Sequence, residues 1–142
     1  MTSKVKSRSE KVAKLSLEHR AGIPASEEER PTFSFRYLSM DVSVKKCDNQ
    51  VFRRFTGRLK ILSEMTWKQI NASDRHHYGW ELIGKDSLKP KKSIPQALSD
   101  VEKFHVFRYD SDNHPFVSVV RGNTIYPLFI EATFGDIYNH GK

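Results

Sequence analysis

The chain has 142 residues, enough for one domain with a hydrophobic core and an appended segment. Hydrophobic residues make up 37% of it, which excludes wholesale disorder, and no stretch approaches the roughly 20 apolar residues that a membrane helix needs. The formal net charge of +7 favours RNA, DNA or a nucleoprotein complex as partner, and we expect a cytoplasmic protein with no membrane partner.

Residues 1 to about 30 carry spaced lysines and arginines and no aromatic residue. We interpret residues 1–30 as a basic N-terminal extension, flexible or partly helical over residues 9–20, and residues 31–142 as a single domain. Pro31 follows closely on Ser26-Glu-Glu-Glu29, which favours a turn or linker over a helix there. The single Cys47 cannot form an internal disulfide and fits a reducing compartment.

The first predicted strand covers residues 32–40, where Phe33, Phe35 and Tyr37 alternate onto one face that we expect to be buried. A helix is predicted from residue 51 to 64, after a cap at residues 48–50, because its apolar residues recur at helical spacing. A Thr66-x-x-Gln69 capping box predicts a second, short helix that ends near residue 73.

Residues 75–84 read as a loop entering a short strand, and residues 85–95 as a lysine-rich loop before a helical turn at 96–101. Three strands follow at 103–109, 115–121 and 124–131, with tight turns between them. Pro127 cannot donate to a strand ladder and implies a bulge or an unpaired edge. The order predicts an α+β fold, an antiparallel sheet of about four strands packed on one main helix.

The last third of the chain combines a basic strand that carries Arg108, a tight turn, the apolar run Ile125-Tyr-Pro-Leu-Phe-Ile130 and the terminal Asp136-Ile-Tyr-Asn-His140. This combination resembles the C-terminal half of the RelE/ParE superfamily, the toxins of toxin–antitoxin modules and their relatives on mobile genetic elements. The resemblance covers about residues 100–141.

The resemblance implies an endoribonuclease that acts on free RNA or on the ribosome, with no metal and no cofactor. Arg108 and Arg121 match the family's arginines, and Tyr138 and His140 match its terminal aromatic and basic positions. Such chemistry needs cations to hold a phosphorane and a group that exchanges protons. The structural alternative is that the two arginines are flanking charges, or pair with acids such as Asp110 and Glu131.

Two further basic groups are candidates for nucleic-acid binding, one on the predicted main helix and one in the lysine-rich loop. They consist of Arg53, Arg54, Arg58, Lys60, Lys89, Lys91 and Lys92. The alternative for the helix is an ordinary solvated face. Adjacent histidines such as His76 and His77 diverge and rarely ligate one ion together, so we predict no metal site.

These observations lead to a first hypothesis, a RelE-like RNA-binding protein that acts on RNA or the translation machinery. In its enzymatic form this protein is a metal-independent ribonuclease toxin. The second is a non-catalytic phage or mobile-element accessory protein that binds nucleic acid or a nucleoprotein complex and inhibits it. A third is an antitoxin-like or immunity protein with a cognate protein partner. The sequence leaves cleavage and mere binding both open.

Overall fold

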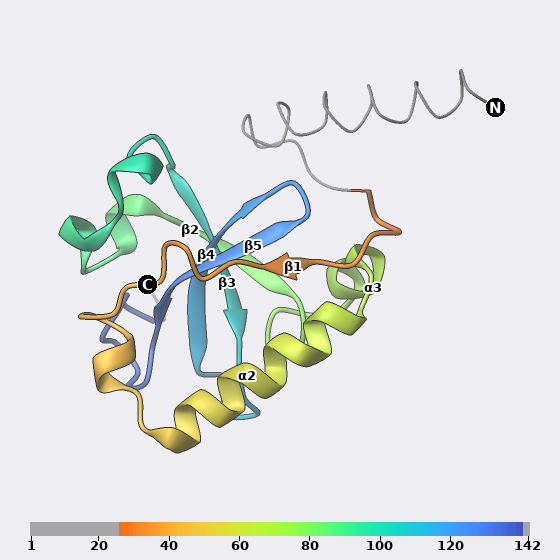
Figure 1. Cartoon of the computed structure of the whole chain (residues 1–142), viewed down its shortest axis with the longest axis horizontal. Helices are drawn as coiled ribbons and strands as arrows, with labels where there is room; N and C mark the ends of the chain where they lie inside the picture. Colours follow the sequence, from red (N-terminus) through yellow and green to blue (C-terminus); the bar gives the residue numbers. More distant parts are fainter. Residues whose placement is uncertain (1–25, 141–142) are drawn as a thin grey trace.

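The computed structural model describes residues 26–140, so the helix predicted at 9–20 lies outside the described residues. The sheet has five strands in the order β1-β5-β4-β3-β2 (Figure 1). They are β1 (Thr32–Phe33), β2 (Trp80–Gly84), β3 (Lys103–Arg108), β4 (Pro115–Arg121) and β5 (Thr124–Ile130). Within residues 26–140, no helix has the length and apolar character needed to cross a membrane.

The α+β class is confirmed, whereas the sheet, predicted to be antiparallel with about four strands, is mixed and has five. Strand β1 runs parallel to β5, whereas every other neighbouring pair is antiparallel. The parallel pair joins Thr32 to Thr124 and Phe33 to Ile125. The sequence did not predict a single parallel strand at one edge, because the alternation of apolar and polar residues marks a strand but does not show which strand it pairs with.

The strand predicted at 32–40 stops after Phe33, and Phe35 is 55% exposed instead of buried. Ser34 still donates its amide to the Ile125 carbonyl, but the next residue of β5 on that side is Pro127, which has no N–H to return. The chain then turns away and covers the rest of this edge through Ser43, whose hydroxyl accepts from the Ile130 amide.

Two helices precede β2, α2 (Asn49–Glu64) and α3 (Trp67–Ala72), and both begin as predicted. The Asp48 side chain accepts from the Val51 amide at 2.8 Å and caps α2. Thr66 and Gln69 form the reciprocal capping box of α3, with both of its hydrogen bonds present. These local signals fix the helix starts independently of tertiary contacts.

Two hydrophobic clusters cover the two faces of the sheet. On one face, Phe55, Leu59 and Leu62 of α2 pack with residues that include Phe107 and Phe116. The other face is covered by the segment between β2 and β3, with three 3-10 turns at Lys85–Ser87, Lys91–Ser93 and Gln96–Leu98, and by residues 137–138. A strand therefore sends alternate residues to a helix and to loops, which is why Arg108 lies on the face opposite α2.

The two hairpins of the closing meander are confirmed. The β4–β5 turn has Gly122 at φ 61° and Asn123 without a positive φ, as in a type II′ turn, where glycine avoids the steric cost. The bulge expected at Pro127 is also present, because Val117 pairs with Phe129 while Ser118 pairs with Pro127, leaving Leu128 as the extra residue.

Leu62 is fully buried in α2, whereas its neighbour Ile61 is exposed. We expect Leu62→Ala to lower the free energy of unfolding by about 3 kcal/mol, because it removes buried methyl groups and leaves a cavity. Ile61→Ala, the matched control, should cost less than about 0.5 kcal/mol. Urea unfolding followed by circular dichroism measures both, and equal losses would contradict the assigned faces of α2.

Candidate functional site

A cavity of about 560 Å³ opens beside β2 and the C-terminal segment. Its walls come from residues 75–76 and 81–83, from Asp86 and Ser87, from the end of β3 at Arg108, and from residues 138–140. Three of the four residues predicted for catalysis line it, namely Arg108, Tyr138 and His140. The fold therefore brings Arg108 and His140, which are 32 residues apart in the sequence, to the wall of one cavity.

Arg108 is the most buried cation of this cavity, with 5% of its surface exposed. Its Nη2 donates to Glu81 Oε1 at 3.0 Å, while its Nε and Nη1 are buried without a hydrogen-bond partner. Arg75 Nη1 donates to the other oxygen of Glu81 at 2.8 Å. Because buried donors normally find acceptors, the free N–H groups of Arg108 favour an acceptor, such as an anion oxygen, in the cavity.

Glu131 is fully buried directly after β5 and holds the C-terminal segment in place. Its Oε2 accepts from the amides of Ile137, at 2.8 Å, and Tyr138, at 3.2 Å. Its Oε1 is hydrogen-bonded to His140 Nε2. The carboxylate thus sets the position of His140 and leaves Nδ1 as the nitrogen able to take up a proton.

Tyr138 is also buried, and its hydroxyl has no hydrogen-bond partner. Burial raises the pKa of Tyr138 to about 12, against the nearby Arg108 guanidinium, which acts on the hydroxyl through its charge and its close approach although the two groups lack hydrogen-bond geometry. The phenol is therefore protonated at neutral pH and can act as a hydrogen-bond donor. Its ring centroid lies 4.2 Å from that of His140.

Arg121 does not join this group. It stands at the far end of β4, six residues from Pro115, which pairs with Arg108, so the strand rise separates the two arginines by about 20 Å. Its guanidinium lies 3.7 Å from Asp100, on the rim away from the cavity. The predicted pairings with Asp110 and Glu131 are also absent among the described residues, because the partners of the arginines are Glu81 and Asp100.

The basic residues predicted to bind nucleic acid do not form one surface. Those of α2 lie on one side of the sheet, and Lys89, Lys91 and Lys92 lie in the segment that covers the other. Arg53 and Lys92 are exposed, Lys60 pairs with Glu64, and Lys91 lies 4.0 Å from Asp86. The charge of the described domain is spread over both faces.

Arg58 has a structural role. Its Nη1 donates to the carbonyls of His77 and Arg108 at 2.7 Å each, and its guanidinium lies over the Tyr78 ring at 4.8 Å. Burial lowers the pKa of Arg58, against the nearby Tyr78 and Asp110. This side chain ties α2 to the two segments that carry the cavity walls.

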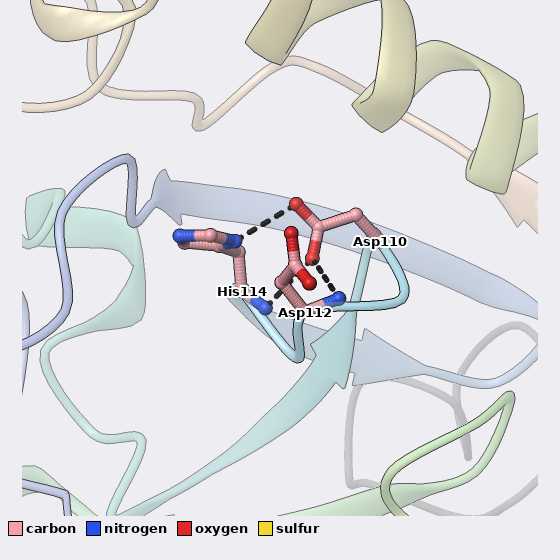
Figure 2. Close-up of side chains that lie close together, drawn as sticks. All are labelled: Asp110, Asp112 and His114. Atoms are coloured by element: carbon pink, nitrogen blue, oxygen red, sulfur yellow. Dashed lines mark hydrogen bonds and ion pairs between the residues drawn. The ribbon is translucent and has the colours of Figure 1, made fainter.

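The turn between β3 and β4 gathers Asp110, Asp112 and His114, whose ligand atoms lie within 4.8 Å of one another. Figure 2 shows that Asp110 is already engaged: Oδ1 accepts from the amides of Asp112 and His114 at 3.0 Å, and Oδ2 is 2.8 Å from His114 Nδ1. Arg54 adds a cation 3.7 Å from Oδ2. These bonds account for the cluster as an ordered turn.

Sequence reasoning missed the acids of the site. Glu81 lies within the predicted strand segment 75–84 and is given no role by its sequence, and Glu131 is considered there only as a partner of the arginines. A signal for Glu131 was present, since a carboxylate that ends an apolar strand must find donors if it is buried. Cys47 stays a poor nucleophile, because burial, followed by the charge of Asp48, raises its pKa to about 11.

No known protein family, curated protein or solved structure matches this chain. The resemblance to the RelE/ParE superfamily therefore stays a prediction.

Replacing Glu131 by Gln should loosen the C-terminal segment, because the bonds to the Ile137 and Tyr138 amides lose their charge assistance and the NH2 group in place of Oε1 cannot accept from His140 Nε2. We expect a loss of about 2 kcal/mol in the free energy of unfolding and faster hydrogen exchange at Ile137 and Tyr138. Asp136→Asn, which alters only a weak ion pair with Lys46, is the control. Unchanged exchange in the Glu131 variant would contradict the anchoring role.

Tyr138→Phe should leave the stability at pH 7 unchanged or raise it by up to about 1 kcal/mol, because the lost hydroxyl is buried and unpaired. The folded pKa, about 12, exceeds the unfolded value of 10.0, so the unfolded state loses the Tyr138 proton first and the stability of the fold falls as the pH rises from 10 to 12. Urea unfolding across that range should therefore show a shallower alkaline loss in the variant. An identical pH dependence would contradict the buried phenol.

Proposed function

We propose that the cavity around Arg108 and His140 binds RNA and cleaves it, as a metal-independent endoribonuclease of the cytoplasm. The observation that supports this most is the joint position of Arg108, Tyr138 and His140, with two free Arg108 N–H groups beside a histidine oriented by a buried carboxylate. The RelE/ParE resemblance favours the ribosome as the place where the protein binds this RNA. Net charge +7 supports attraction to the phosphate backbone.

In the proposed reaction the RNA 2′-oxygen attacks the adjacent phosphorus and the bond to the 5′-oxygen breaks, giving a 2′,3′-cyclic phosphate and a 5′-hydroxyl. His140 Nδ1 takes the 2′-hydroxyl proton, while the Nε2 proton stays with Glu131. Arg108 Nε and Nη1 donate to the phosphate oxygens, where negative charge develops. The protonated Tyr138 adds a donor, and the proton gained by His140 passes through water to the leaving 5′-oxygen, which becomes the 5′-hydroxyl.

Glu81 holds the two arginines of the cavity in position before a phosphate binds. Its two oxygens hold Arg108 and Arg75, and the Arg75 side chain is 58% exposed. An exposed guanidinium can turn from Glu81 to a phosphate at little cost, whereas Arg108 is fixed by burial. Arg75 is therefore assigned to capture the backbone and Arg108 to hold the reacting group.

The second candidate is a non-catalytic accessory protein that occupies a nucleic acid or a nucleoprotein complex. The observation that favours it is that both cavity arginines are ion-paired with Glu81, combined with exposed lysines at 89, 91 and 92 outside the cavity. In this reading the lysines bind phosphates by charge and the cavity group is structural. Binding that weakens steeply with salt, without any cleavage, is its signature.

Incubation of the full chain with RNA, with and without ribosomes, tests the ribonuclease. We expect His140→Gln to slow cleavage about 100-fold or more, because the proton acceptor is lost, and Arg108→Lys to slow it about 100-fold. Excess EDTA should change nothing. His77→Gln is the control, since His77 is exposed and pairs with Asp74 on the surface.

Cleavage by the wild type that His140→Gln leaves intact would contradict the assigned base. The absence of cleavage under both conditions, with salt-sensitive binding retained, would replace the first candidate by the second.

A further inference from the structure

Phe134 is a large apolar side chain that the fold leaves 50% exposed. It lies in the segment between β5 and Ile137, just before Gly135, whose φ is 94°, in a turn where the Asp136 amide donates to the Thr133 carbonyl. Single exposed apolar side chains are common, so a role for Phe134 has to be argued from the groups that hold its ring and from those around it.

The ring of Phe134 is held between two histidines. It stacks on His114 with centroids 4.4 Å apart and planes 11° apart, and it meets His140 edge-on at 5.3 Å. Each histidine is itself bound to a carboxylate, His114 to Asp110 and His140 to Glu131. Two anchored groups therefore fix the orientation of the ring, and half of the Phe134 surface stays exposed.

Cations lie near this ring, together with the carboxylates that hold the two histidines. His140 lines the same cavity as Arg108, whose Nε and Nη1 are buried without a hydrogen-bond partner. On the other side, Lys89 donates to the carbonyl of Gly135, next in the chain to Phe134. An oriented aromatic face beside buried and exposed cations is the arrangement on which single-stranded nucleic acids bind, with a base on the ring and phosphates on the cations.

We propose that Phe134 is a stacking platform for one unpaired base of a single-stranded RNA whose adjoining phosphate enters the cavity toward Arg108. The inference deepens the proposed function, on which its choice of RNA rests. Bases in a duplex are already stacked and their faces are inaccessible, so the platform selects single strands and splayed-out bases.

The test measures binding without cleavage. A short single-stranded RNA that carries 2′-O-methyl groups has no free 2′-hydroxyl to attack phosphorus, and its affinity for the full chain is measured by fluorescence anisotropy at fixed salt. We expect Phe134→Ala and Phe134→Leu to weaken binding about tenfold, and Phe134→Trp to retain or strengthen it. Leu keeps the apolar volume but removes the π-face, which separates stacking from simple burial.

Phe35→Ala is the matched control, because Phe35 is equally exposed but contacts Phe55 of α2 on the other face of the sheet. It should bind the oligonucleotide like the wild type. A duplex of the same sequence should bind more weakly to the wild type and should be insensitive to Phe134→Ala. Equal affinities of the wild type, Phe134→Ala and Phe134→Leu for the single strand, or equal loss in the Phe35 control, would overturn the platform.

The two proposals fail separately. If unmodified RNA is cleaved and Phe134→Leu binds the single strand as the wild type does, the platform is refuted while the ribonuclease stands. If the single strand binds through Phe134 but no RNA is cleaved, the ribonuclease is refuted and the platform stands.

Discussion

The buried carboxylate of Glu131 is the constraint on which the candidate site depends. A charge with no access to water is costly unless donors surround it, and here two backbone amides and His140 supply them. To deliver those donors the chain after β5 must fold back on itself. The same return path lets Lys89 donate its amide to the Ile137 carbonyl and pairs Leu88 with Tyr138, which closes the second face of the sheet.

Arg58 links this end of the molecule to α2. Its guanidinium reaches past the helix to the last residue of β3 and to the loop before β2, so the helix that packs on one face of the sheet also fixes the walls of a cavity on the other. A residue that the sequence marks as surface charge is therefore part of the framework. Because the Arg58 guanidinium is half-buried, the number of basic residues on α2 overstates the positively charged surface that a ligand can reach.

The parts of the fold governed by local chemistry were predictable from the sequence. Asp48 and Thr66 cap the two helices as their spacing indicates, and Gly122 and Pro127 set the turn and the bulge of the meander. The short β1 was not predictable, because its end depends on a missing donor in a strand about 90 residues away. Period-two alternation describes a side-chain pattern and carries no information on the pairing edge.

The residues that line the candidate site were also predicted only in part. Arg108, Tyr138 and His140 were found through a pattern at the C-terminal end, and the return of the chain at Glu131 is what unites them. Arg121 fails to join because it ends β4, whereas Arg108 pairs with the first residue of that strand, an arrangement that the predicted hairpin of strands 103–109 and 115–121 already implies. Glu81 and Arg75 were missed since their relation to Arg108 exists only through the register of β2 on β3.

The edge position of β2 has a consequence for the behaviour of the molecule at high concentration. Among residues 26–140 no strand pairs with its outer side, and Leu82 is exposed there, which is the situation in which two copies add strands to one another. Arg75, Glu81 and Lys85 surround this edge with charge. Arg75 and Glu81 also line the cavity, so the charges to which the proposed function assigns RNA capture lie on the same edge where they oppose the pairing of two copies.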